Sequence, residues 1–260
     1  GSRLAVEGIA EGVWDIWVVD LERGSKTLVT THREGGLPTW GPNDGSVTFY
    51  SKPETGPWRL WWKRADATGH AEVGFTDDRG LVESDWSSDY RWLVASTQSG
   101  KGNQGDILGW RVGEDTMRTL VATDAWERAP TLSPGGRFRA YVSDESGEDH
   151  VSLRPVPNVG DWKQQVSVEP GGEPVWAPNG EELFYRKGVS GDLVAVQIAP
   201  RDSFPAAGEE VLFWTGEYWS GGWQHPGYDV APDGQRFLLM RRRSEDWYSA
   251  EGRVIQILNW

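Results

Sequence analysis

Short apolar runs alternate with turn sequences along the whole chain. Residues 173–187 read EPVWAPNGEELFYRK, in which an apolar run ends at Trp176, Pro178-Asn179-Gly180 follows, and a second apolar run begins. Proline fixes one φ angle, and Asn-Gly accepts positive φ angles at low cost. This stretch therefore predicts a β-hairpin with its turn at Pro178-Asn179-Gly180.

The hairpin pattern recurs along the chain at a nearly constant interval. The residue before each turn marks one unit, and these residues are Trp40, Trp86, Leu132, Trp176 and Val230. They are 46, 46, 44 and 54 residues apart. A repeat period in the forties is typical of a solenoid or a propeller.

The second unit shows how many strands each repeat contains. Apolar, β-prone runs at 37–40, 46–52, 59–66 and 71–76 predict four antiparallel strands, which is the composition of a propeller blade. The next three units fit the same four-strand pattern. The first unit lacks an inner strand and the last lacks a fourth strand, so the sequence predicts 22 strands in total.

We therefore predict an all-β fold, a six-bladed β-propeller of four-stranded antiparallel blades whose terminal blades are incomplete. The whole of 1–260 is expected to form one domain. Its units span about 1–36, 37–80, 81–127, 128–171, 172–226 and 227–260. Ring closure then requires edge pairing between the terminal units, or a strand from upstream of Gly1, because an open gap exposes sheet edges.

Composition excludes several kinds of chemistry. The chain has no cysteine, which removes disulfides, thiolate zinc sites and thiol nucleophiles. The histidines His32, His70, His150 and His225 show no metal-ligand spacing, and we expect neither a metal nor a cofactor. No apolar run approaches 18 residues and no signal-peptide pattern is present, so this segment is expected to be soluble, with no membrane contact.

Net charge and aromatic content narrow the choice of partners. A formal charge of −13 and a pI near 4.8 repel phosphate backbones, so nucleic acid is not an expected partner. Tryptophan is unusually abundant, with 17 residues against 7 Phe and 7 Tyr. Part of these residues fill the core, and we expect others to be exposed for ligand contact.

The loops that enter the inner strands are the expected ligand site, because in a propeller they meet at one mouth of the central channel. These segments are 32–36, 77–80, 124–128, 169–173 and 217–225. The predicted ligand-binding residues in them are His32, Arg33, Arg79, Trp126, Arg128, Tyr218, Trp219, Trp223 and His225. The alternative is structural: the charged residues pair with each other, and the two tryptophans cover a blade edge.

Catalytic signals are weak, and no catalytic residue is predicted. Adjacent carboxylates such as Asp77-Asp78 project to opposite faces of a strand, and the chain has no G-x-S-x-G element. His32 and His225 lie in loops of the same predicted mouth, where a nearby carboxylate would make a base or a loose metal site, but nothing in the spacing enforces this.

Two stretches resemble a known repeat family. DIWVVDL at 15–21, followed by TLVT at 27–30, and the W-x-P-D/N-G turns resemble the TolB-type β-propeller repeat over essentially the whole chain. The C-terminal segments 228–238 and 254–260 look like the last blade of propeller regions that follow membrane-anchored bacterial serine/threonine kinases. This second resemblance implies a kinase upstream and an extracytoplasmic location, periplasmic or at the cell surface. The repeat itself is specific for fold and not for function.

The predicted function is a non-enzymatic binding or sensor propeller that holds its ligand at the central channel mouth. The expected partner is a protein, a peptide or a small extracellular ligand, including a carbohydrate. Two alternatives stay open: a propeller enzyme, either a hydrolase acting on glycans or the gating propeller of a larger peptidase, and a purely structural role with terminal blades pairing between chains.

Overall fold

The computed structural model describes most of the chain. The described residues are 2–10, 13–31, 35–42, 45–51, 55–100, 104–156, 160, 162–199, 206–218, 225–241 and 253–258. All structural statements below refer to these residues. Within them, no helix is long and apolar enough to cross a membrane.

Twenty-two strands form six antiparallel sheets, and strands consecutive in the chain are neighbours in each sheet. The first sheet contains β1 (Arg3–Ala10), β2 (Val13–Asp20) and β3 (Lys26–Leu28). The second contains β4 (Gly35–Trp40), β5 (Ser46–Ser51), β6 (Arg59–Arg64) and β7 (Glu72–Phe75). The third contains β8 (Leu81–Trp86), β9 (Trp92–Thr97), β10 (Ile107–Arg111) and β11 (Arg118–Val121).

The other three sheets continue this order along the chain. The fourth contains β12 (Glu127–Leu132), β13 (Phe138–Ser143), β14 (His150–Pro155) and β15 (Gln164–Gln165). The fifth contains β16 (Gly171–Trp176), β17 (Glu182–Lys187), β18 (Asp192–Ile198) and β19 (Ala206–Trp214). The sixth contains β20 (Tyr228–Val230), β21 (Arg236–Arg241) and β22 (Arg253–Leu258).

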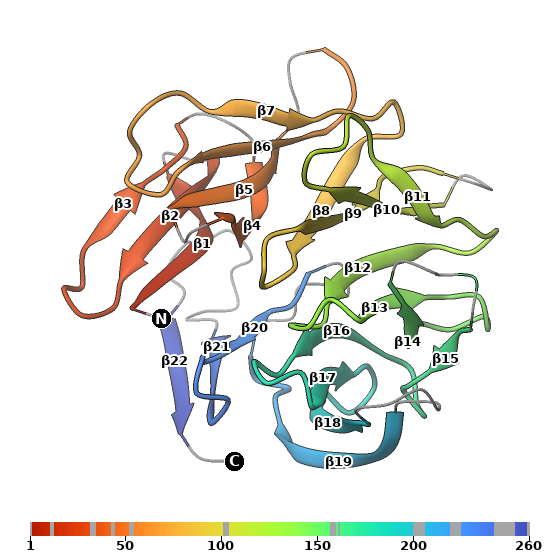
Figure 1. Cartoon of the computed structure of the whole chain (residues 1–260). Helices are drawn as coiled ribbons and strands as arrows, with labels where there is room; N and C mark the ends of the chain where they lie inside the picture. The colour runs from red at the N-terminus through yellow and green to blue at the C-terminus, as the bar shows by residue number, and fades with distance from the viewer. Residues whose placement is uncertain are drawn as a thin grey trace.

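The sheets are arranged around a common centre, with the N-terminal and C-terminal sheets beside each other (Figure 1). The structure confirms an all-β propeller of four-stranded antiparallel blades. Four of the sheets are complete blades, and the two at the chain ends have three strands each. With the two incomplete terminal sheets taken together, the ring has five blades and not the six that the sequence predicted.

The turns form as their residues predict, with one instructive exception. At Gly180 the φ angle is 73°, and its N–H donates to the carbonyl of Ala177 at 2.9 Å. The third sheet has neither Pro nor Gly at its turn, yet Tyr90 takes a φ of 54° and donates to Ser87 at 2.8 Å. The register of the repeat therefore outweighs the cost of placing a bulky residue in the left-handed region.

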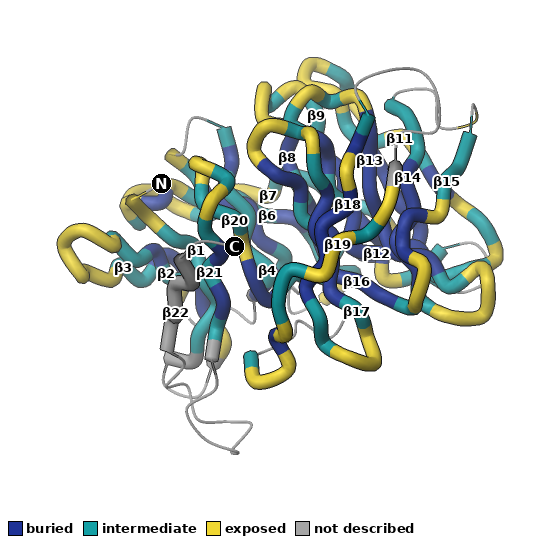
Figure 2. The backbone as a smooth tube through the Cα atoms, turned by 90° about the horizontal axis from the view of Figure 1, so that it is seen from below, coloured by how far each residue is buried: buried dark blue, intermediate teal, exposed yellow. Residues whose placement is uncertain are grey.

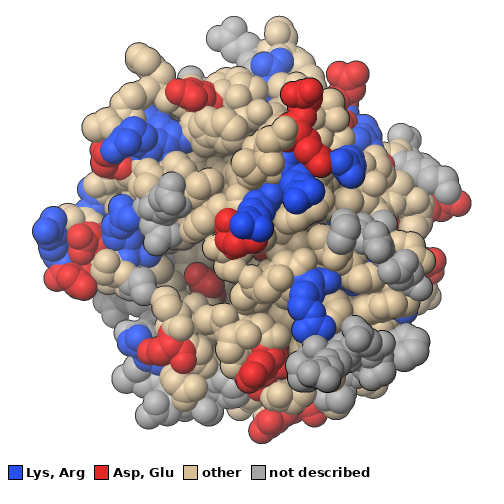
Figure 3. Space-filling view, in the orientation of Figure 1, with Lys and Arg blue, Asp and Glu red and all other residues tan. Residues whose placement is uncertain are grey.

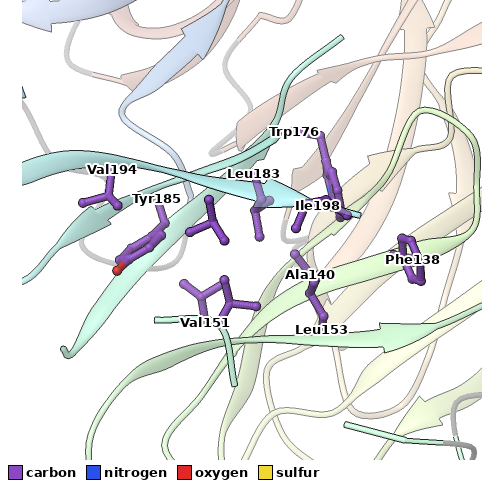
Figure 4. Packing of buried hydrophobic residues seen from close by; sticks show 11 residues of the cluster. Phe138, Ala140, Val151, Leu153, Trp176, Leu183, Tyr185, Val194 and Ile198 are labelled. Carbon is purple, nitrogen blue, oxygen red and sulfur yellow. The ribbon is translucent and has the colours of Figure 1, made fainter. Parts of the chain in front are cut away.

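The core lies mainly between neighbouring sheets. Figure 2 shows buried positions concentrated where the sheets pack and exposed positions in the outer turns. The largest cluster joins the fourth and fifth sheets: Phe138, Ala140, Val151, Leu153, Val166, Trp176, Leu183, Tyr185, Val194, Val196 and Ile198 (Figure 4). Each sheet thus depends on its neighbour for burial of its apolar face.

Candidate functional site

A cavity of about 260 Å³ lies at the centre of the ring. It is lined by β4, β8, β12, β16 and β20, by residues 3–7 of β1, and by Leu238 and Met240 of β21. We call it the central cavity. Figure 3, in the orientation of Figure 1, shows Asp or Glu side chains at the bottom of a hollow near the middle of this face.

One position of each inner strand supplies a side chain to the central cavity. The penultimate residues of β4, β8, β12, β16 and β20 all line it, and these are Thr39, Asp85, Thr131, Val175 and Asp229. The last residues of β8 and β16 face the other way, because successive side chains of a strand alternate. Trp86 and Trp176, for example, are buried between sheets. The inner strands therefore present a ring of five unlike side chains, two of them carboxylates.

Asp85 is the better anchored of these carboxylates. Its Oδ2 atom accepts hydrogen bonds from the Thr131 hydroxyl at 2.8 Å and from the Leu132 N–H at 3.0 Å. Burial raises the pKa of Asp85 to about 6 despite these bonds, and the charge of the neighbouring Asp229 carboxyl adds to the rise. Asp229 itself is exposed to the cavity.

An ion pair crosses the central cavity. The Nδ1 atom of His225, just before β20, lies 3.4 Å from Oε1 of Glu83 in β8, although the third and sixth sheets are not neighbours in the ring. Burial alone favours the neutral imidazole, but the Glu83 carboxylate outweighs it, so the pKa of His225 lies above its ordinary value. Burial also raises the pKa of Glu83, and His225 offsets only part of that rise.

Glu83 retains an unused acceptor inside the cavity. Its side chain is only 5 % exposed, and its carboxylate accepts a hydrogen bond from the Ala129 N–H. Within the described part of the chain, no donor lies within hydrogen-bond distance of its Oε2 atom. A buried carboxylate oxygen without a donor is costly, so it favours a ligand that brings one. With Glu7, Asp85 and Asp229, four carboxylates line the cavity against Arg3 and His225. Because the carboxylates outnumber the basic side chains, the cavity attracts a cation.

The predicted site residues divide between several places. His225 lines the central cavity. Tyr218 lines a separate hollow of about 470 Å³ with Trp214 and residues of β16 and β17. His32, Arg33, Trp219 and Trp223 lie outside the described residues, and their assignment to ligand binding stays a prediction.

The other three predicted residues are engaged with neighbouring side chains. Arg79 donates to Asp77 at 2.8 Å and to Asp106 at 2.9 Å. Arg128 is buried, pairs with Asp149, and lies over the Trp126 ring at 4.5 Å from its centroid. These contacts correspond to the structural alternative, in which loop charges pair with each other; none of the three lines the central cavity.

The sequence-based site omitted Glu83, Asp85 and Asp229. Asp85 and Asp229 each stand immediately before the residue that marks a unit, at Trp86 and Val230. If the repeats are aligned, the position just before each marker residue holds a carboxylate in two of them. That comparison would have identified both residues as candidates for the cavity. Across the described residues, no group of three His, Asp or Glu side chains is placed to hold a metal ion.

The raised pKa of Asp85 predicts how stability changes with pH. The folded state holds a proton on Asp85 up to about pH 6, whereas the unfolded chain loses it near pH 4, so this group's contribution falls as pH rises through that window. Asp85→Asn keeps an oxygen acceptor for Thr131 and Leu132 and removes the titration. In urea denaturation, the unfolding free energy should fall more between about pH 4 and about pH 7 in the wild type than in Asp85→Asn. Equal responses would contradict the assignment.

Comparison with known proteins identifies the fold. No protein-family model matches the sequence, and no curated protein matches it. Among solved structures, TolB from Acinetobacter baumannii superposes with a TM-score of 0.62 at 17 % identity, over 76 % of this chain and 49 % of the TolB chain. This chain therefore spans about half the length of that TolB.

Two enzymes also share the architecture. An oligogalacturonate lyase in complex with manganese superposes with a TM-score of 0.61 at 14 % identity, over 94 % of this chain and 69 % of the lyase. A prolyl endopeptidase superposes with a TM-score of 0.58 at 12 % identity, over 100 % of this chain and 41 % of the peptidase. At these identities the likeness shows the fold alone. The chain has the β-propeller fold that these three proteins share.

Proposed function

We propose that this propeller is a non-enzymatic binding module that holds a cationic group of a protein, peptide or small ligand in its central cavity. The observation that carries the proposal is the buried Oε2 atom of Glu83, which has no hydrogen-bond donor among the described residues, in a cavity with three further carboxylates. A ligand ammonium or guanidinium would supply the missing donor and offset the cavity charge. The Arg3 and His225 side chains leave this balance acidic.

A cation in this position would be held better than on an open surface. Charge attraction strengthens as water is excluded, and the penultimate residues of the inner strands surround the cavity on several sides. Thr39 and Thr131 add hydroxyl acceptors that orient a ligand without adding charge. The site therefore favours a ligand with one cationic group and neutral flanking parts.

The proposal includes the cellular location and the upstream domain that the sequence resemblance implies. An extracytoplasmic location and a membrane-anchored kinase in the same protein follow from the resemblance alone. Sequencing the full reading frame tests both.

An enzymatic role is the alternative, because an oligogalacturonate lyase and a prolyl endopeptidase share the fold. Incubation with oligogalacturonate and with a proline-containing peptide separates the two functions. The binding proposal expects no product above a buffer control. Turnover that Asp85→Asn abolishes would overturn it.

An octapeptide array tests the binding proposal directly. We expect the labelled chain to select peptides that contain Lys or Arg over neutral and acidic ones. Asp229→Asn removes one exposed cavity charge and should weaken these peptides about fivefold. Asp115→Asn, which removes an exposed charge between β10 and β11, is the matched control and should change nothing. Selection of acidic peptides, or an equal effect of both variants, would refute the proposal.

A further inference from the structure

A second hollow, of about 470 Å³, lies at one end of the fifth sheet, and the proposed function does not use it. Its lining comes from the start of β16, from residues 186–191 at the turn from β17 to β18, and from the chain that leaves β19. β19 is the outer strand of this sheet (Figure 1). The volume lies within the roughly 300–1,000 Å³ of small-molecule sites. We call this space the Trp214 hollow.

Trp214, the last residue of β19, is the most exposed tryptophan among the described residues, at 58 %, yet its position is fixed. Its indole N–H donates to the carbonyl of Ser190 at 2.9 Å. The next residue, Thr215, donates its backbone N–H at 2.9 Å and its hydroxyl at 2.5 Å to the carbonyl of Gly191. A side chain that is held in place before binding loses little conformational entropy when a ligand contacts it.

Two glycines allow this close approach of the turn and the end of β19. A Cβ atom at Gly216 would lie 2.4–2.7 Å from Cζ2, Cε2 and Nε1 of Trp214, so a side chain at this position would displace the ring. A Cβ atom at Gly191 would lie 3.2 Å from the Cα atom of Gly216. Val189, at the tip of the turn, is 92 % exposed and lines the same hollow. The hollow therefore offers a fixed aromatic ring with further apolar surface at its rim.

The basic side chains of the hollow already have carboxylate partners. Arg186 is 8 % exposed and lies 3.6 Å from Glu173. Lys187 is 11 % exposed and lies 3.1 Å from Glu169 and 3.3 Å from Glu209. Because each cation is paired, net charge in this hollow selects neither an anion nor a cation. Paired charged groups still place hydrogen-bond donors and acceptors side by side, which favours a neutral ligand whose groups do both.

We propose that the Trp214 hollow binds a neutral carbohydrate, with one pyranose ring against the indole of Trp214 and its hydroxyls toward the polar lining. A pyranose carries C–H groups on the faces of its ring and hydroxyls around the rim, and each hydroxyl is both donor and acceptor. Tyr218, which the sequence analysis assigned to ligand binding, lines the same hollow. This site goes beyond the proposed function, because the central cavity selects a cation.

Four neutral oligosaccharides test the ligand class: cellohexaose, mannohexaose, chitohexaose and maltohexaose. In heteronuclear NMR spectra of the full chain, at least one of them should shift the indole N–H resonance of Trp214, which is identified by its absence from Trp214→Phe. Trp214→Ala should weaken that oligosaccharide about tenfold. Sorbitol has hydroxyls but no ring, and it should leave the resonance in place. No shift with any of the four oligosaccharides would overturn the proposal.

A second variant tests the fixed ring and keeps every side chain of the hollow. Gly216→Ala should displace the indole and weaken the same oligosaccharide about tenfold, since its methyl group needs the space of the ring. Gly135→Ala is the matched control, because the nearest atoms to its methyl group lie 4.0 Å away. Trp14→Ala controls for loss of an exposed tryptophan: Trp14 is 47 % exposed and lines neither cavity. Neither control should change the affinity, and thermal unfolding checks that each variant folds.

The outcomes separate this site from the central cavity. Trp214→Ala should leave the selection of Lys- and Arg-containing peptides unchanged, and failure of those peptides to bind would overturn the proposed function alone. Equal oligosaccharide affinity in the wild type, Trp214→Ala and Gly216→Ala would overturn the carbohydrate site. Binding of hexaproline at Trp214, with no response to any oligosaccharide, would overturn it in favour of a proline-rich segment.

Discussion

Replacing Glu173 by alanine is expected to lower the free energy of unfolding by about 3–5 kcal/mol, because it leaves a buried guanidinium without its carboxylate. Glu173 is 2 % exposed, and its Oε1 atom lies 3.6 Å from Nη1 of Arg186, whose side chain is 8 % exposed. Its Oε2 atom also accepts the N–H of Gly227 at 2.9 Å. One side chain thus satisfies a charge and joins the fifth sheet to the sixth.

The measurement is urea denaturation monitored by tryptophan fluorescence, since a loss of this size is a large part of a domain's stability. Glu169→Ala is the control: Glu169 pairs with Lys187 but is 57 % exposed, so its loss should cost no more than about 1 kcal/mol. Glu173→Gln keeps the acceptor for Gly227 and should fall between the two. If Glu173→Ala and Glu169→Ala cost the same, the buried pair does not hold the sheets together.

Replacing Arg139 by leucine is expected to raise the free energy of unfolding by about 1–4 kcal/mol. Arg139 is 0 % exposed, and none of its guanidinium nitrogens has a hydrogen-bond partner among the described residues. Burial lowers the pKa of Arg139 to about 10, and the nearby Arg154 charge adds to the effect. A buried cation in this state is costly, and an apolar residue removes that cost.

The repeat supports leucine at this site. The second residue of β5, β9, β17 and β21 is apolar and fully buried, and these residues are Val47, Leu93, Leu183 and Phe237. Thermal and urea unfolding compare Arg139→Leu with Arg137→Leu, at an exposed position two residues earlier, for which a change within about 0.5 kcal/mol is expected. Destabilisation by Arg139→Leu would mean that the charge has a stabilising role in the core.

The strands and turns could be predicted because their causes are local. A hairpin such as the one at Gly180 needs a proline, an Asn-Gly pair and two apolar runs, all within a few residues. The hairpin recurs at intervals of mostly 44 to 46 residues, and this repeat length indicated a propeller, in which sheets surround a central axis. Even Tyr90, whose turn lacks Pro and Gly, follows the repeat, because the flanking strands determine the register.

The cavity residues could not be predicted in the same way. The sequence analysis placed the ligand site in the loops before the inner strands, yet of the five predicted residues that the structure describes only His225 lines the central cavity. β4, β12 and β16 carry register shifts with positive φ angles at Leu37, Ala129 and Glu173. A bulge of this kind changes which later side chains face the axis, and a simple alternation of apolar and polar residues does not reveal it.

By itself, the sequence determined the all-β repeat, its 22 strands, the hairpin turns and the acidic character of the chain, since each depends on residues close together or on composition. Only the tertiary structure decided that Glu83 meets His225 and that Asp85 and Asp229 share one cavity. Those residues belong to different repeats. Curvature of the ring brings them together, and that curvature arises from packing between whole sheets.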